Sequence, residues 1–109
     1  MANIIPFAFR GELFSGTHDF SNGGNSFKIA LYTSNPYTTS STAYSTSNEV
    51  SASNTGYTTG GKVLASQAVA SSTAVASVDF ADSSLASATF TAAFAAIYND
   101  TNSDKLCVV

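Results

Sequence analysis

The sequence has few of the side chains on which catalysis and metal binding depend. Its 109 residues include one histidine, one cysteine and no tryptophan, and only 10% of them are charged. A single cysteine cannot form an internal disulfide, so the stability of the domain has to come from packing or from a partner. Because nucleophiles and bases are so scarce, we expect no enzymatic activity, no catalytic residue and no cofactor.

Basic side chains and long apolar runs are also missing. The four cations, Arg10, Lys28, Lys62 and Lys105, are scattered, and the formal net charge is −3. Nucleic-acid binding needs clustered lysine and arginine, so we expect no nucleic-acid partner. No stretch approaches the roughly 20 apolar residues of a membrane span, and we expect no membrane partner.

What remains is a composition of small, β-branched and aromatic residues, in which serine and threonine exceed a quarter of the chain. This composition favours strands over helices. The length suits one domain, since a second domain would have too small a core. We therefore expect a single β-rich scaffold whose surface and backbone carry the function.

The N-terminal residues are apolar and contain a proline. Pro6 fixes its own φ and pushes Ile5 towards extended geometry, so we expect an extended arm over residues 1–9 and a domain over 10–109. A short helix is expected over 10–15, with Gly16 placed to end it. The arm has to bury four apolar side chains in its own core or in a neighbouring subunit, and both alternatives stay open: Ile4, Ile5, Phe7 and Phe9.

Alternating patterns predict the strands. In the segment 27–33, Phe27, Ile29 and Leu31 lie on one face. Further strands are expected over 62–70 and 73–80, joined by a turn at Ser71-Ser72, and over 105–109. The segment 86–98 fits both a strand and a helix, and the surrounding strands favour a strand. The expected fold is an antiparallel β-sandwich or barrel-like domain.

A long polar stretch, residues 34–47, separates the first two predicted strands and carries Tyr37 and Tyr44. It is too long for a simple hairpin turn and is typical of a crossing connection or a functional loop. The two tyrosines are candidate contact residues for a protein partner or a sugar, and half-buried sheet aromatics are the alternative.

Three further groups of residues are candidates for chemistry. His18-Asp19 has no nucleophile beside it in the sequence, so we expect a solvated or hydrogen-bonding loop histidine. Cys107 lies in an apolar run and is predicted to be a small buried hydrophobe. Four aspartates lack the alternating ligands and closing glutamate of a calcium loop, so no metal site is expected there: Asp79, Asp82, Asp100 and Asp104.

Three segments, taken in order, resemble a family of small virion structural proteins of tailed bacteriophages. The first is the FKIALYTS run that begins at Phe27. The second joins NEVS, from Asn48, to GYTTGG, from Gly56, and is similar to the family's NEVSGTGYTxGG. The third contains DFAD, from Asp79, then IYN, from Ile97, and the final strand.

The resemblance implies a compact β domain in the virion without enzymatic activity. We expect a capsid decoration or cement protein on the outer capsid surface that binds the phage major capsid protein and itself, as a homotrimer. A tail, baseplate or fibre protein, and a carbohydrate-binding module for host adsorption, are the alternatives. The predicted contact residues are those of the arm and of the long loop: Ile4, Ile5, Phe7, Phe9, Tyr37 and Tyr44.

Overall fold

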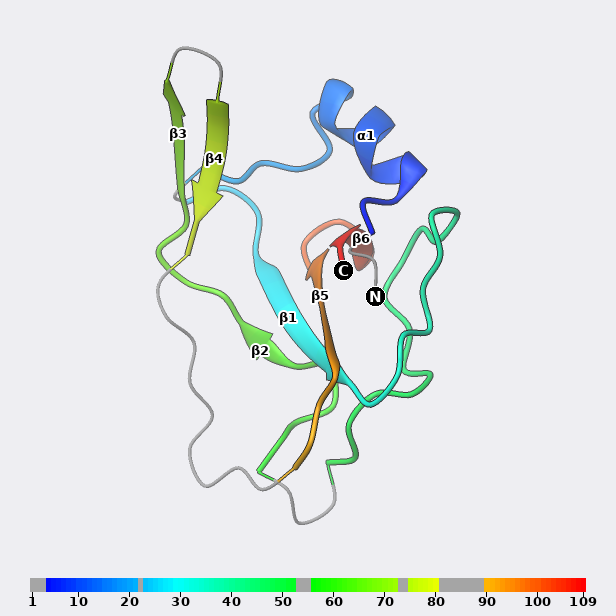
Figure 1. Ribbon diagram of the computed structural model, residues 1–109. Coiled ribbons are helices and arrows are strands. Elements are labelled where there is room, and N and C mark those ends of the chain that lie inside the picture. The colour runs from blue at the N-terminus through cyan, green and yellow to red at the C-terminus, as the bar shows by residue number, and fades with distance from the viewer. Residues whose placement is uncertain (1–3, 22, 53–55, 73–74, 81–89) are drawn as a thin grey trace.

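The computed structural model describes residues 4–21, 23–52, 56–72, 75–80 and 90–109 of the chain. Four strands form an antiparallel sheet in the order β2-β1-β5-β6, and β3 pairs with β4 in a separate hairpin (Figure 1). The predicted mainly β fold is confirmed. The elements are α1 (Phe7–Phe14), β1 (Phe27–Tyr32), β2 (Lys62–Val63), β3 (Ala68–Ser72), β4 (Val75–Asp79), β5 (Phe94–Asn99) and β6 (Lys105–Val108).

Strands β1 and β5 form the centre of the four-stranded sheet, with pairing from Phe27↔Asn99 to Tyr32↔Phe94. The strand interpretation of the segment 86–98 is therefore correct from Phe94 onward. Residues 90–93 precede the strand, and residues 86–89 lie outside the described residues. β5 has a paired neighbour on each side, and this pairing outweighs the helix propensity of its alanines.

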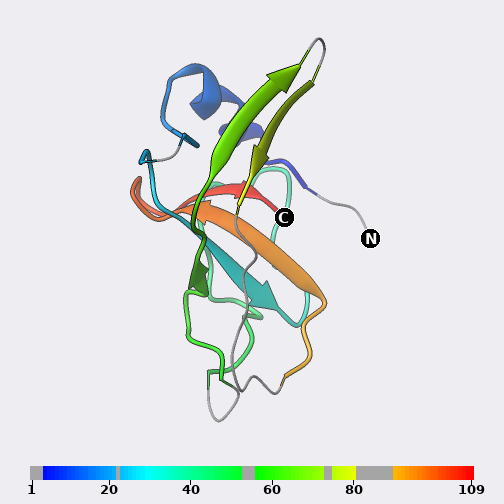
Figure 2. The same ribbon diagram turned by 90° about the vertical axis from the view of Figure 1, so that its left-hand side faces the viewer.

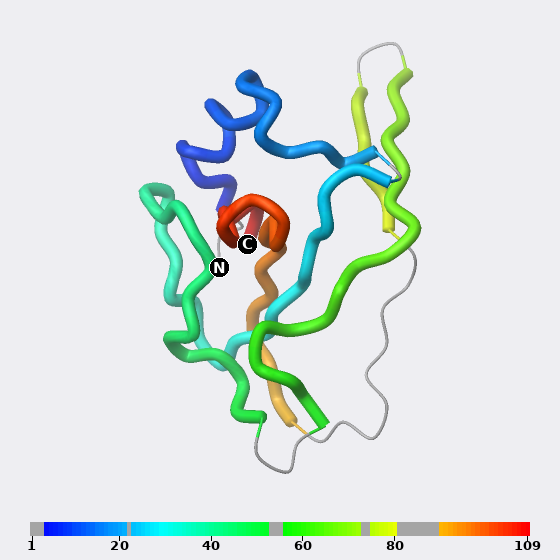
Figure 3. The backbone as a smooth tube through the Cα atoms, turned by 180° about the vertical axis from the view of Figure 1, so that it is seen from behind, coloured from blue at the N-terminus to red at the C-terminus, as the bar shows by residue number. Residues whose placement is uncertain are grey.

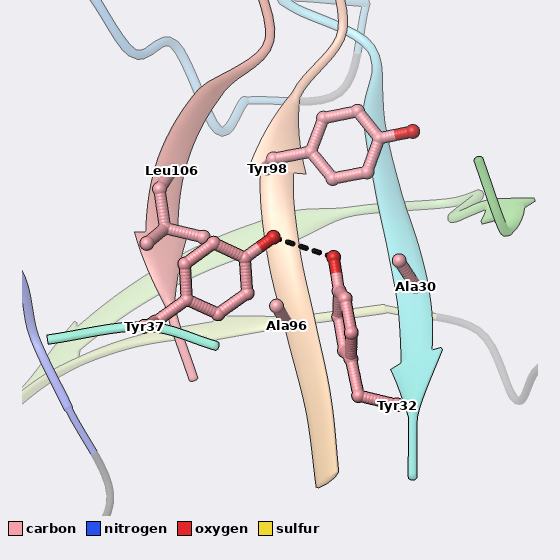
Figure 4. Close-up of a cluster of buried hydrophobic side chains, with 6 residues drawn as sticks. All are labelled: Ala30, Tyr32, Tyr37, Ala96, Tyr98 and Leu106. Carbon is pink, nitrogen blue, oxygen red and sulfur yellow. Dashed lines mark hydrogen bonds between the residues drawn. The ribbon is translucent and has the colours of Figure 1, made fainter. Parts of the chain in front are cut away.

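Both faces of the sheet are covered, because successive residues of a strand point to opposite sides. One face, here called the tyrosine side, holds a buried cluster (Figure 4): Ala30, Tyr32, Tyr37, Ala96, Tyr98 and Leu106. The other, here called the phenylalanine side, is built on Phe27, Leu64 and Cys107, with Phe9, Phe20, Ile29, Phe80 and Ile97 packed against them. The expected alternation along β1 is present, but both of its faces carry buried residues: Ala30 and Tyr32 on one side are as fully buried as Phe27 on the other.

The N-terminal helix begins at Phe7, so the expected arm is extended only as far as Pro6, and residues 7–9 are helical. Pro6 occupies the N-cap position with φ −60° and ψ 146°. A proline is well tolerated where a helix begins, because the N–H it lacks would have no helical partner there. Ile4 exchanges two backbone hydrogen bonds with Val109, at 3.4 and 2.9 Å, and so extends the sheet beside β6.

The β3–β4 hairpin differs from its prediction in register. Ser71 and Ser72 belong to β3 and pair with Ala76 and Val75, so the predicted turn at the two serines is wrong by two positions. Residues 73 and 74, between the strands, lie outside the described residues. The hairpin stands at one end of the sheet, on the same side of the molecule as α1 (Figures 1 and 2).

The predicted strand 62–70 is divided into two pieces. Its first two residues form β2 at the edge of the large sheet, and its last three begin β3. Ser66, between them, has φ 54° in the left-handed region, which breaks the extended conformation. One segment therefore contributes to both sheets. In the described part of the chain, no helix is long and apolar enough to span a membrane.

Candidate functional site

The four predicted contact residues of the N-terminal segment do not share one environment. Ile4 packs against the tyrosine side and Phe9 against the phenylalanine side, so these two belong to the core of their own domain. Ile5 and Phe7 are 48% and 58% exposed. Ile4 and Phe9 are therefore partly buried in the core of their own domain. Of the four residues, only Ile5 and Phe7 remain exposed and available to a partner.

Tyr37 and Tyr44, the other two predicted contact residues, are turned into the fold. Tyr37 is 5% exposed, and its hydroxyl lies 2.5 Å from that of Tyr32 (Figure 4). Tyr44 stacks on Tyr98 with ring centroids 4.5 Å apart. Burial raises the pKa of all four tyrosines. The prediction of Tyr37 as a contact residue is therefore wrong, because its side chain is buried inside the domain.

The described parts of the long connection after β1, residues 33–52 and 56–61, run beside the sheet (Figure 3). The middle of the connection pairs with the outer side of β6: the Tyr44 N–H donates to the Asp104 carbonyl at 2.8 Å, and the Leu106 N–H donates to the Thr42 carbonyl at 3.0 Å. Long loops carry unpaired backbone groups, and here the edge strand satisfies them. The connection covers the sheet edge.

Glu49 is the centre of a polar network within this connection. Its carboxylate accepts hydrogen bonds from the hydroxyls of Tyr44 and Tyr57, each at 2.5 Å, and from the Gly60 N–H at 2.8 Å. The Tyr57 hydroxyl in turn accepts from the Leu31 N–H of β1 at 3.1 Å. Burial raises the pKa of Tyr57, and the bond to Glu49 adds to the shift. The network ties the connection to the central strand.

Gly61 explains the glycine pair that follows Tyr57 in the sequence. Its φ is +86°, and a Cβ at this position would lie 2.0 Å from the carbonyl oxygen of Ile29. Only glycine can therefore bring the backbone this close to β1. The pair Gly60-Gly61, with φ +96° and +86°, is thus a tight backbone corner that closes the connection onto β1.

A second network surrounds His18, which is a buried hydrogen-bonding residue and not a solvated one. Its Nε2 lies 2.8 Å from Glu12 Oε1, and its Nδ1 lies 2.9 Å from Asn99 Nδ2. Because the amide nitrogen of Asn99 is a donor, Nδ1 accepts and Nε2–H donates to the carboxylate. The Asn99 amide also donates to Asn25 Oδ1 at 3.0 Å. The network joins α1, the loop after it and the end of β5.

Cys107 completes an arrangement that the sequence did not predict, because its members are far apart along the chain. Its Sγ lies 3.8 Å from His18 Nδ1, so a thiol, an imidazole and the Glu12 carboxylate follow one another as in a nucleophile, base and orienting acid. The thiol, however, is 1% exposed, and burial raises its pKa to about 12. His18 Nδ1 already accepts from Asn99. The arrangement is that of a structural core, and the prediction of a buried thiol is confirmed.

Metal-binding groups were also compared with the structure. Within the described ranges, no three histidine, cysteine, aspartate or glutamate residues are grouped closely enough to hold a metal ion. Asp82, one of the four aspartates considered, lies outside those ranges, as do Ala81 and the rest of the third segment up to residue 89.

An apolar groove of about 440 Å³ lies on the surface between α1 and the hairpin. One wall is formed by Leu13 of α1 and the other by Val78 of β4, while Ile97 and Cys107 of the phenylalanine side form the floor. Val69 of β3 also lines it. The groove separates the helix from the hairpin, and the sequence did not predict it because its walls come from three distant segments.

None of the three comparisons with known proteins returns a match, whether with protein-family models, with curated proteins or with solved structures. The candidate functional site is therefore defined by geometry alone. It comprises the groove, the exposed residues of α1 and the β3–β4 hairpin, here called the α1–hairpin surface.

Proposed function

We propose that the protein is a structural component of a tailed-bacteriophage virion, without enzymatic activity, and that it acts as a capsid decoration or cement protein. In this role it lies on the outer capsid surface, binds several subunits of the major capsid protein and associates with itself as a homotrimer. The ordered resemblance of the three segments supports the class of protein. The distribution of exposed apolar side chains supports an adhesive role.

That distribution is the observation that carries the proposal. Large exposed hydrophobic residues gather on the α1–hairpin surface, whereas the tyrosine side is closed by its own loop. They comprise Ile5, Phe7, Leu13, Phe14, Val69, Val75 and Val78; Val63 of β2 is the one elsewhere among the described residues. Exposed apolar surface of this extent is typical of a site that binds another protein.

The charge and size of the protein agree with a position on the outside of a shell. A formal net charge of −3 disfavours contact with packaged DNA. A small protein present in many copies strengthens a shell by multivalent contacts, none of which needs to be strong. The acidic, mostly uncharged surface is suited to such contacts.

Of the two alternatives, the tail, baseplate or fibre protein uses the same adhesive surface and differs from the cement protein in copy number. The carbohydrate-binding module needs exposed rings on which a sugar can stack. Tyr37 and Tyr44 are the candidates for that platform, and they pack against Tyr32 and Tyr98 instead. The structure offers this alternative no specific support.

Cryo-electron microscopy of the intact particle tests the proposal directly. Density for the protein on the outer shell, repeated with the icosahedral symmetry, is the expected result. Density confined to the tail, baseplate or fibres would replace the cement protein with its first alternative. Purified particles that lack the protein entirely would overturn the virion role.

A further inference from the structure

His18 is the single histidine of the chain, and the fold encloses it. Its side chain is 0% exposed, and its ring lies among those of Phe9, Phe20 and Phe27, with centroids 5.0, 6.3 and 6.5 Å away. β1 contributes Phe27 to this enclosure and β5 contributes Asn99, and neither side chain titrates. An imidazole gains or loses a proton near neutral pH, so a buried one can make a conformation sensitive to acid.

The hydrogen bonds of Asn99 fix the protonation state of the ring. Asn99 Oδ1 accepts from the backbone N–H groups of Thr101 and Asn102, at 3.1 and 3.2 Å. This orientation turns the amide nitrogen of Asn99 towards His18 Nδ1, at 2.9 Å, and towards Asn25 Oδ1, at 3.0 Å. Nδ1 is therefore an acceptor, and the neutral ring carries its one proton on Nε2.

A second proton on His18 can be placed only on Nδ1. There it would face the amide N–H groups of Asn99, donor against donor, and Asn99 cannot turn over without breaking its two bonds to backbone N–H groups. A buried imidazolium with an unsatisfied N–H carries the full cost of desolvation. The closed arrangement therefore accommodates the neutral ring and excludes the charged one.

The charged groups around the ring offset this cost only in part. Glu12, on α1, attracts an imidazolium, but its second carboxylate oxygen lies 3.6 Å from Lys105 Nζ of β6, which repels one. Burial raises the pKa of Cys107, also on β6, to about 12, so its thiol stays neutral. The Asp19 carboxylate is exposed and bonds to Ser21. One ion pair shared with a lysine does not offset both the burial of a charge and the donor conflict.

The ring can reach solvent only if α1 moves. Phe9 of α1 packs against the imidazole, and Glu12, three residues further along the helix, accepts from its Nε2–H at 2.8 Å. Helix α1 has no fully buried residue, and the Phe7 N–H donates to the Thr39 carbonyl. A helix of eight residues is not stable alone in water. Opening the contacts of His18 therefore releases α1, whereas the sheet keeps its own pairing.

We propose that the contacts of His18 with Glu12 and Asn99 form a proton-sensitive attachment of α1 to the sheet. At neutral pH the neutral ring holds residues 7–14 in place. In mild acid a proton from solvent binds Nδ1, the ring moves into water, and α1 detaches while β1, β5 and β6 stay paired. The inference concerns a change of conformation in the isolated chain and is independent of the virion role.

The size of the effect follows from proton linkage. A histidine in an open chain has an ordinary pKa of about 6.5, and the closed site holds only the neutral ring, so opening takes up one proton in acid. The attachment is thus strongest above about pH 7 and weakens as the pH falls. The equilibrium constant for opening rises about thirtyfold between pH 7.5 and pH 5.

NMR of the full chain tests the proposal, because its one histidine gives a single set of ring signals. Long-range ¹H–¹⁵N spectra at pH 7.5 should show a neutral ring with its proton on Nε2. Hydrogen exchange, corrected for the intrinsic rates at each pH, should show the protection of amides 11–15 falling about thirtyfold between pH 7.5 and pH 5. The amides of β1 and β5 should keep their protection within about threefold.

Asn99→Asp and Asn102→Asp form a matched pair of variants. The first places a carboxylate oxygen opposite His18 Nδ1, where it accepts from the imidazolium, so α1 should stay protected down to pH 5. The second introduces the same charge where the native amide donates to Thr17 and Asn25 and not to His18, so the release in acid should persist. Circular dichroism and the β1 amides report whether each variant is folded.

His18→Gln has a side chain that gains no proton, so its α1 protection, whatever its level at pH 7.5, should not change with pH over this range. The inference is overturned if α1 in the unaltered chain keeps or gains protection in acid, because the ion pair with Glu12 then dominates. It is also overturned if His18→Gln shows the same release, or if Asn99→Asp releases α1 as the unaltered chain does. Equal loss of protection in β1 and α1 would show global unfolding and reject a separate attachment.

Discussion

The four-stranded sheet and the α1–hairpin surface reach opposite degrees of burial. Sheet strands β1, β5 and β6 contain residues that are 0–2% exposed, whereas every residue of β3 and β4 is exposed. The strands differ chiefly in their aromatic content. β1 and β5 carry Phe27, Tyr32, Phe94 and Tyr98, while the hairpin strands contain only alanine, serine, valine and one aspartate.

This difference shows what holds the domain together. Aromatic rings bury large areas, and a tyrosine also brings a hydroxyl that can bond to the backbone. In the sheet, the hydroxyls of Tyr32 and Tyr98 donate to the backbone carbonyls of Ser45 and Gly60, so these parts of the connection after β1 are tied to the sheet. Among the described residues, the strands of the hairpin have no comparable anchor. Its small side chains leave its surface free for a partner, and the sheet provides the rigid support.

The largest expected effect is on the sheet side, at Gly61. Substitution by alanine places a Cβ 2.0 Å from the Ile29 carbonyl oxygen, with φ held at +86°. Neither the backbone of β1 nor that of the corner can move without breaking pairing, so we expect a loss of more than about 3 kcal/mol in the free energy of unfolding. Urea denaturation followed by circular dichroism measures it. A loss below about 1 kcal/mol would show that the corner is not tightly packed.

An intermediate effect is expected at Glu49. Glu49→Gln removes the charge that accepts hydrogen bonds from Tyr44, Tyr57 and Gly60, and we expect unfolding to become easier by about 1.5–3 kcal/mol. The matched control is Asp79→Asn on the hairpin, which should change the free energy of unfolding by no more than about 0.5 kcal/mol. Equal losses at the two positions would contradict the distinction between the two regions.

The tyrosine side should also make the fold sensitive to alkali. Burial raises the pKa of five tyrosines above the ordinary value of about 10: Tyr32, Tyr37, Tyr44, Tyr57 and Tyr98. Their folded pKa values exceed the unfolded ones, so the stabilisation is complete below about pH 10 and is lost as the pH rises further. We expect the melting temperature to fall steeply above about pH 10.

Tyrosinate absorbance distinguishes this mechanism from others. It should rise together with the loss of the circular dichroism signal, because the hydroxyls ionise only when the fold opens. Tyr57→Phe lacks one of the titrating groups, so its melting temperature should depend less steeply on pH in this range. Full ionisation near pH 10 in a chain that remains folded would contradict the burial of these hydroxyls.

The smallest effect is expected on α1. Gly11 lies within the helix, and a Cβ there meets nothing within 4 Å. Gly11→Ala should therefore raise the free energy of unfolding, by about 0.5–1 kcal/mol, because alanine favours the helix. The same glycine-to-alanine substitution is thus expected to stabilise the protein at Gly11 and to destabilise it at Gly61. A destabilising Gly11→Ala would mean that the helix has a different conformation or is covered.

Much of the sheet was predictable from the sequence because the information is local. Alternation in the segment 27–33 predicts β1, and the apolar run after Lys105 predicts β6. The division of the segment 62–70 into β2 and β3 was not predictable. It depends on the left-handed conformation of Ser66, a residue type with no strong preference for it.

The surface and the networks were predictable only in part. Ile5 and Phe7 are exposed, as a contact role requires, whereas Ile4 and Phe9 point into the core. No sequence pattern separates the two pairs, because helix α1 begins at Phe7 and the periodicity changes there. The burial of Tyr37 and the meeting of His18 with Cys107 depend on residues far apart in the chain. The groove arises from three such segments, and no local signal marks it.

Hydrogen exchange of the full chain at increasing protein concentration tests the central claim most directly. The claim is that the sheet is complete in itself and that the α1–hairpin surface is completed by a partner. We expect the amides of β1 and β5 to be protected at every concentration, and those of β3 and β4 to be protected only where the chain associates. Hairpin amides as strongly protected as those of β1 in the dilute monomer, or still unprotected in the assembled protein, would contradict it.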